Sequence, residues 1–210
     1  MSPNPQVVII PCCSRKKPGG KSEFQSPGWL RSRLGPASAE RPLGARRELA
    51  AHFDLQPGPD LGFAESGADA RFLPASERYD GNMYRAADFC HTWPRSQGKQ
   101  VLIVSALYGL LLADDPIREY DVGMHCHGPD GSRLHTWWKR QRLGRIVAEC
   151  ALSFLPTMIQ DLLSGNYRKA LAPWRAHELA GIRNQYDPGV VGFPADRARG
   201  QRLREILQDP

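Results

Sequence analysis

The chain has 210 residues, and Lys and Arg outnumber Asp and Glu to give a formal net charge of +6, so we expect one domain with or without a helical appendage. The basic balance favours polyanionic partners, of which nucleic acid is the commonest, although an arginine-rich solvated surface gives the same charge. The sequence has no run of about 18 apolar residues, which excludes a membrane-spanning helix.

The cysteines and the first residues indicate a compartment. The five cysteines lack the spacing of metal-binding fingers, and Pro3 and Pro5 flank a polar Asn4 where a secretory signal would begin. We therefore expect a cytoplasmic protein with free, reduced thiols.

The predicted elements begin with a short buried strand over residues 7–10, which is β-branched and ends at a proline. The loop over residues 11–20 follows it and contains two adjacent thiols, a hydroxyl and three basic residues. Ligands bind at the carboxyl ends of strands in open parallel sheets. Ser14 and Lys17 are therefore expected to bind an anion or a base edge, with Cys13 beside them. The thiols are alternatively nucleophiles activated by nearby cations, or buried under the sheet.

The middle of the chain predicts a helix, a loop, a second helix and a second strand. A helix is predicted over residues 41–53, and residues 54–70 are expected to form an exposed loop. The Asp-Gly pair at 80–81 predicts a turn, and helical spacing of apolar residues continues from it to Cys90. Residues 100–105 are the clearest buried strand in the chain.

The remaining segments are expected to be loop and helix. Residues 114–130 predict a polar loop, and helices are predicted over residues 134–155, 158–165 and 195–207. The predicted fold class is α/β, with a mixed, partly parallel sheet, flanking helices and a helical C-terminal part. We expect a single domain over residues 1–210, in which residues 125–210 are mostly helical.

Polar side chains gather in three loops, at residues 11–17, 76–84 and 105–121. The first and third follow buried strands, so both would open at the same sheet edge if those strands are parallel neighbours. The predicted pocket is lined by Ser14, Lys17, Tyr79, Ser105, Tyr108, Tyr120 and Asp121.

Three fragments, PCCSRKKP, ASERYDGNMYRAA and VSALYGLLLADDPIREYDVGM, resemble the YaaA-like superfamily of bacterial peroxide-stress proteins and their short relatives. The first also resembles the Pro-Cys-Ser-x-x-Lys-Pro motif in the core domain of archaeosine synthases, with Lys17 at its lysine, but Gly19 stands where that motif has a tyrosine. The resemblance covers residues 7–18 and 72–124. It implies DNA binding and, in some superfamily members, chemistry on modified bases that includes cleavage of base–sugar bonds.

Asp121 is the best catalytic candidate, because a carboxylate near the sugar stabilises an oxocarbenium-like state and activates water. Its alternative role is an Asx-turn that holds the loop. Trp138 lies next to three cations, Lys139, Arg140 and Arg142, and such aromatic-basic clusters stack single-stranded or flipped-out bases. The alternative places one of the paired tryptophans in the core and the other at the surface.

The predicted function is a DNA glycosylase that cleaves the N-glycosidic bond of a modified base, with DNA as the partner. The alternatives are a non-catalytic DNA-binding stress-response protein and an enzyme that acts on a free nucleoside or nucleotide. A zinc interpretation of His125, Cys126, His127 and His135 is possible, but exposed loop histidines are commoner. No metal and no other cofactor is expected.

Overall fold

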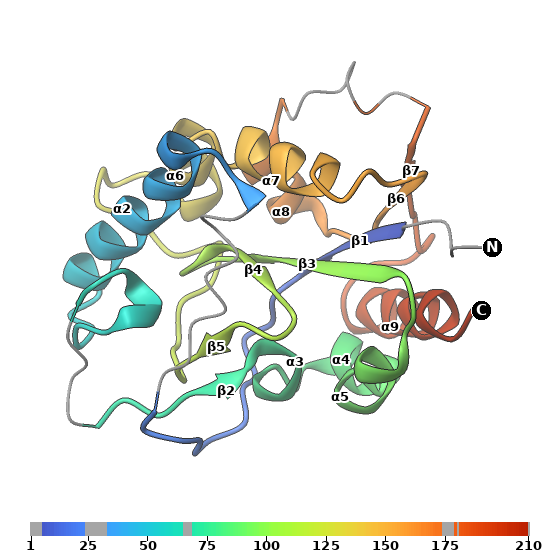
Figure 1. The fold of residues 1–210 in the computed structure, drawn as a ribbon, viewed down its shortest axis with the longest axis horizontal. Helices are drawn as coiled ribbons and strands as arrows, with labels where there is room; N and C mark the ends of the chain where they lie inside the picture. The colour runs from blue at the N-terminus through green and yellow to red at the C-terminus, as the bar shows by residue number, and fades with distance from the viewer. Residues whose placement is uncertain (1–5, 24–32, 65–68, 174–178, 180, 210) are drawn as a thin grey trace.

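A five-stranded mixed sheet forms the centre of the computed structural model, which describes residues 6–23, 33–64, 69–173, 179 and 181–209 (Figure 1). The strand order is β4-β3-β1-β6-β7. The strands are β1 (Gln6–Pro11), β3 (Lys99–Ser105), β4 (Gly109–Leu112), β6 (Met158–Asp161) and β7 (Arg183–Gln185). The predicted α/β class with a mixed, partly parallel sheet is confirmed.

The central strand β1 runs parallel to both β3 and β6. Residues 7–10 are 0% exposed, so helices cover this strand on both faces, and its sequence is a continuous apolar run rather than an alternating one. Strand β4 returns antiparallel to β3 after Gly109, whose φ of 71° suits a glycine. The carboxyl ends of β1, β3 and β6 consequently lie at one edge of the sheet.

Helices cover both faces of the sheet (Figure 1). One face carries α2 (Pro36–His52), α6 (Leu134–Arg140), α7 (Leu143–Leu152) and α8 (Gly165–Leu171). The other carries α3 (Ala75–Arg78), α4 (Asn82–Ala87), α5 (Phe89–Thr92) and α9 (Phe193–Gln208). Two 3₁₀ turns, η1 (Pro59–Leu61) and η2 (Trp93–Arg95), and a small antiparallel pair, β2 (Leu73–Pro74) with β5 (Pro116–Ile117), complete the described elements.

Helices α4 and α9 pack unusually close together at Gly200. A Cβ atom at this position would lie 2.3 Å from the carbonyl oxygen of Met83 and 2.7 Å from the Cβ of Ala86. The missing side chain therefore lets the two backbones approach. This contact places the first turn of α9 beside the start of α4, at the carboxyl edge of the sheet.

Several predicted elements need correction. The predicted helix over residues 158–165 is wrong: residues 158–161 are strand β6, paired with β1, because a short apolar run alone does not distinguish a buried strand from a helix. The predicted helix over residues 134–155 is two helices, separated at Arg142, whose φ of 58° is left-handed. Asp88, with φ 49°, likewise separates α4 from α5. Residues 125–210 contribute two strands to the main sheet as well as helices.

The loops are also more ordered than their polarity suggests. Within the predicted exposed loop over residues 54–70, turn η1 buries Asp60 and Leu61, and residues 65–68 lie outside the described part of the chain. Within the predicted polar loop over residues 114–130, Ile117 and Tyr120 are buried. The predicted helix over residues 41–53 is confirmed and starts earlier, at Pro36. None of the described helices is long and apolar enough to cross a membrane.

Candidate functional site

A pocket of about 390 Å³ opens at the carboxyl end of β1, and we call it the strand-end pocket. The loop over residues 11–15 forms one wall, and the starts of α4 and α8 and the first turn of α9 form the others. Among the lining side chains are a hydroxyl on Ser14, an amide on Asn82 and a carboxyl on Asp196. The site thus lies where parallel sheets ordinarily bind ligands.

Cys13 is built into this wall as a neutral thiol. Its Sγ donates to the carbonyl oxygen of Arg15 at 3.0 Å and accepts from the backbone N–H of Gly81 at 3.3 Å. Burial, with the neighbouring Cys12 as a second cause, raises the pKa of Cys13 to about 12. A Cβ on Gly81 would lie 2.6 Å from the Cβ of Cys13, so the turn needs glycine there. The thiol therefore packs and hydrogen-bonds, and it is not a ready nucleophile.

Two tyrosines hold the end of β1 from opposite faces of the sheet. Tyr84 on α4 donates its hydroxyl to the carbonyl oxygen of Pro11 at 2.9 Å, and Tyr167 on α8 donates to that of Cys12 at 3.1 Å. Burial raises the pKa of both phenols well above the ordinary value. Both are consequently neutral and fix the geometry of the pocket.

Asp196, in the first turn of α9, carries the carboxyl group of the pocket. The side chain is 47% exposed; its partial burial raises its pKa, and Arg199, with Nη1 3.5 Å from Oδ1, opposes this effect only in part. A carboxyl group with a raised pKa in a pocket is a candidate for acid–base chemistry. Sequence reasoning missed Asp196 because it lies more than 180 residues from the first loop; its only local signal was an acidic residue after Pro194 at a helix start.

Three predicted pocket residues meet in a buried hydroxyl cluster. The hydroxyls of Tyr79 and Tyr120 are 2.7 Å apart, and Ser105 Oγ lies 3.0 Å from the Tyr120 hydroxyl. Ser105 Oγ also accepts from the backbone N–H of Tyr108 at 3.1 Å. The predicted grouping of these side chains is therefore present, but they satisfy one another in the interior instead of lining the strand-end pocket.

Lys16 faces this hydroxyl cluster. Its ammonium nitrogen lies 3.8 Å from the ring centroid of Tyr120 and donates to the carbonyl oxygen of Ser14 at 3.1 Å. Burial lowers the pKa of Lys16, while the nearby Asp121 is among the groups that oppose the shift. The sequence predicts ligand binding by the adjacent Lys17, and it offers Lys16 only as one of the cations that could activate the thiols.

Lys17 and Asp121, the two charged residues of the predicted pocket, are exposed. Asp121 lies near Lys16 and is not among the described residues that line the strand-end pocket. Lys17 lines a different, smaller hollow of about 250 Å³ with Asp88 and His91. The structure therefore separates Ser14 from Lys17 and Asp121, which the sequence had placed in one pocket.

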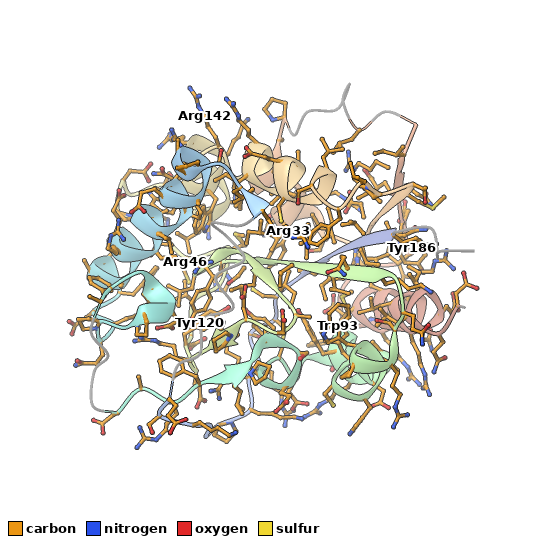
Figure 2. All side chains as sticks on the ribbon, viewed as in Figure 1. Arg33, Arg46, Trp93, Tyr120, Arg142 and Tyr186 are labelled. Atoms are coloured by element: carbon orange, nitrogen blue, oxygen red, sulfur yellow. The ribbon has the colours of Figure 1, made fainter. Side chains whose placement is uncertain are left out.

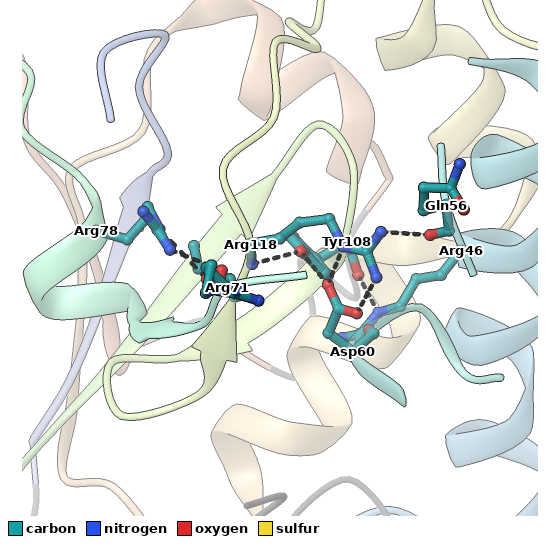
Figure 3. A network of polar contacts seen from close by, with 8 residues as sticks. Arg46, Gln56, Asp60, Arg71, Arg78, Tyr108 and Arg118 are labelled. Atoms are coloured by element: carbon teal, nitrogen blue, oxygen red, sulfur yellow. Dashed lines mark hydrogen bonds and ion pairs between the residues drawn. The ribbon is translucent and has the colours of Figure 1, made fainter. Parts of the chain in front are cut away.

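Tyr108 points into a buried polar network (Figure 3). Its hydroxyl donates to Asp60 Oδ2 at 2.6 Å, and the same carboxylate accepts two hydrogen bonds from Arg118, at 2.6 and 2.8 Å. Arg46 donates from Nε to the Tyr108 carbonyl oxygen at 3.0 Å. Tyr108 is thus a structural residue of the core.

The predicted nucleic-acid surface has no accessible tryptophan at position 138. Trp138 is 0% exposed and donates its indole N–H to the carbonyl oxygen of Ala106 at 2.8 Å, so no ring face is available for stacking. Lys139, Arg140 and Arg142 are exposed; Arg140 pairs with Asp130, and Figure 2 shows Arg142 projecting away from the ribbon. What remains is a solvated basic surface.

His125, Cys126, His127 and His135, the possible zinc ligands, do not form a group of side chains close enough to share a metal ion. Within the part of the chain that the structure describes, the one group of three potential metal ligands is Asp88, Cys90 and His91. There His91 Nδ1 lies 2.7 Å from Asp88 Oδ1, an exposed contact between a residue of α5 and the residue that precedes this helix. Hydrogen bonding accounts for this contact without an ion.

Comparison with known proteins gives a family. UPF0246 protein TM1040_2658 from Ruegeria sp. (strain TM1040) is 28% identical over 142 residues, which are 62% of this chain and 56% of that relative, so the chain spans little more than half the relative's length. The family model described as peroxide stress protein YaaA matches residues 48–210, a stretch that includes Asn82, the hydroxyl cluster and α9. Because the match covers well over half of the sequence, this chain belongs to the YaaA family of peroxide stress proteins.

Proposed function

We propose that the protein acts on nucleic acid and cleaves the N-glycosidic bond of a modified base held in the strand-end pocket. The observation that carries this proposal is the Asp196 carboxyl group, with its raised pKa, in a pocket of about 390 Å³ at the carboxyl edge of a parallel sheet. Pockets for small ligands commonly have volumes of roughly 300–1,000 Å³, and the volume of this one lies within that range. The net charge of +6 favours a polyanionic substrate.

Each polar group of the pocket has a role in this reaction. The bond between the sugar C1′ and the base nitrogen breaks, and its electron pair leaves with the base. Ionised Asp196 stabilises the oxocarbenium-like centre and accepts a proton from the water that adds to C1′. The departing base takes up a proton from solvent. Ser14 and Asn82 supply a hydroxyl and an amide for the edge of the base.

Asp196 replaces Asp121 as the first catalytic candidate because it lines the pocket. Asp121 remains the second candidate, since it lies near Lys16 over the hydroxyl cluster. All five cysteines are free, which suits a reducing compartment, and we place the protein in the cytoplasm with DNA as its partner.

The test compares Asp196→Asn with Asp121→Asn on oligonucleotides that carry a panel of modified bases, measuring released base by chromatography. We expect Asp196→Asn to lower the rate about a hundredfold or more, because the amide cannot carry the required negative charge. Asp121→Asn should retain activity, and both variants should give the far-ultraviolet circular dichroism spectrum of the folded wild type.

The other outcomes separate the competing functions. Loss of activity only in Asp121→Asn would move the chemistry to the loop beside Lys16. DNA binding without base release from any substrate would favour a non-catalytic DNA-binding protein. Release from free nucleosides but not from oligonucleotides would favour a small-molecule enzyme.

A further inference from the structure

A second hollow, of about 590 Å³, adjoins the strand-end pocket, and we call it the α4–α9 hollow. Its lining residues are Asn82, Arg85, Ala86, Phe193, Pro194 and Arg197. Asn82 and Phe193 also line the strand-end pocket, so the two hollows meet at these side chains. The two hollows are therefore neighbours, with these side chains between them.

Phe193 is the most unusual side chain of this junction. It is the first residue of α9 and is 77% exposed, whereas most aromatic side chains of the described chain are buried. The chain enters the helix through Gly192, at φ 68°, and Pro194 follows, so the backbone on both sides of the ring has restricted or unusual dihedrals. An exposed ring at the rim of two hollows is placed to stack against a planar partner.

The groups around the ring match a nucleotide. Pro194 and Ala86 continue the apolar wall, and Asn82 offers an amide donor and acceptor. Asp80 pairs with both Arg15, at 3.3 Å, and Arg85, at 2.5 Å, which leaves one positive charge uncompensated in that group. Arg197 adds a second cation at the rim. Stacking faces flanked by cations are how proteins bind single strands, because every base has a π-face and every nucleotide a phosphate.

We propose that the α4–α9 hollow binds the base adjacent to the one in the strand-end pocket, stacked on Phe193, with its phosphate near Arg85 and Arg197. This inference rests on the proposed function of the neighbouring pocket. It identifies the substrate as a single-stranded or locally opened polynucleotide and not a free nucleotide. The aromatic platform that the sequence places at Trp138 is thereby assigned to Phe193.

Fluorescence anisotropy with an unmodified twelve-nucleotide thymidine oligomer tests the proposal on the full chain. Phe193→Ala should weaken binding of the oligomer about tenfold, a usual effect of removing one stacking ring. Phe193→Trp should bind as well as the wild type. Thymidine monophosphate, which can fill only one of the two hollows, should bind the wild type more weakly than the oligomer does. The matched control is Val191→Ala, because Val191 is 88% exposed in the same segment and lines neither hollow.

A second variant, Arg197→Ala, tests the proposed contact between a cation and the phosphate. Arg197→Ala should reduce the slope of log affinity against log salt by roughly one phosphate contact, with little effect on the preference for single strands. An unchanged slope removes Arg197 from the proposed contact surface and contradicts the phosphate part of the proposal.

The outcomes distinguish this inference from the proposed function, because one is read by binding and the other by base release. Equal oligomer binding by the wild type, Phe193→Ala and Val191→Ala overturns the stacking proposal even if Asp196→Asn abolishes base release. A selective Phe193 effect without base release leaves stacking intact and removes the glycosidic chemistry. Absence of oligomer binding by the wild type also overturns the inference. So does a wild-type dimer in sedimentation analysis that Phe193→Ala and Val191→Ala both abolish, since Phe193 would then be part of a self-association surface.

Discussion

Burial raises the pKa of both Cys13 and Asp196, but the chemical consequences differ between a thiol and a carboxyl group. For the thiol, a pKa of about 12 means that the nucleophilic thiolate is almost absent at neutral pH. The role proposed for Asp196 requires its ionised form, because a carboxylate stabilises positive charge, and its raised pKa shows that the pocket influences its protonation. Asp196, and not the Cys13 thiol, is therefore the candidate reactive group of the strand-end pocket.

The raised pKa of Asp196 also has a consequence for stability. The folded state holds this proton more tightly than the unfolded state, so the stabilisation is complete below the unfolded pKa and is lost as pH rises through the folded pKa. Asn at this position does not titrate. Urea unfolding from pH 3 to 7 should show the wild type losing stability relative to Asp196→Asn as pH rises. A difference that stays constant, or that changes in the opposite direction, would contradict the burial of this carboxyl group.

At the scale of elements, α9 contributes lining residues to both hollows. Its buried face, which includes Leu203, Ile206 and Leu207, packs into the core, and its first turn presents Phe193 and Asp196. The close approach to α4 at Gly200 brings this turn to Asn82. Local sequence predicts the helix, but only its crossing with α4 makes its first residues part of a site.

Gly200→Ala tests this crossing. The new Cβ would meet the Met83 carbonyl oxygen at 2.3 Å, and backbone atoms cannot easily move away, so we expect a loss of about 1–3 kcal/mol in the free energy of unfolding. Gly44→Ala in α2 is the control, because its nearest contact is the end of Arg47 at 3.9 Å and alanine favours helix by about 0.5–1 kcal/mol. Equal effects of the two substitutions in urea denaturation would show that the helices are less closely packed.

At the scale of the whole molecule, buried arginines connect segments that are distant in sequence (Figure 3). Arg46 on α2 donates to the carbonyl oxygens of Tyr108, Leu110 and Asp60. Arg78 on α3 donates to carbonyl oxygens in three further segments, at residues 17–19, 71 and 117. Planar guanidinium groups with five donors suit such junctions, which hold the loops around the hydroxyl cluster in place.

The Asp60–Arg118 pair is the most buried ion pair of this system, with side chains 1% and 8% exposed. Asp60→Asn leaves the Arg118 guanidinium buried without its counter-charge, so we expect a loss of about 3–5 kcal/mol in the free energy of unfolding. The exposed Arg47–Glu40 pair provides the comparison, and Glu40→Gln should change stability by less than about 1 kcal/mol. Similar melting temperatures for the two variants would contradict the structural role of the network.

Much of the fold follows from local pattern. The β-branched run at residues 7–10 and the apolar run at residues 100–105 predict buried strands, and both are central strands of the sheet. Ser105 is the last residue of the second strand and Tyr120 lies in the predicted loop after it, and both meet Tyr79 in the hydroxyl cluster. The position of Ser105 and Tyr120 at and after a strand end favours their meeting, whereas Tyr79 comes from the separate segment over residues 76–84.

The tertiary structure decided what each of these residues can do. Residues 158–161 are a strand because they pair with β1, and Trp138 is buried with its indole N–H donated to the carbonyl oxygen of Ala106; neither fact is local. Asp196 and Phe193 became site residues through the α4–α9 crossing, more than 100 residues away in sequence from their partners on α4. Periodicity reports which face of a segment is apolar, but the neighbour that covers that face is chosen by packing between distant segments, and burial by that neighbour sets exposure, pKa and access to a ligand.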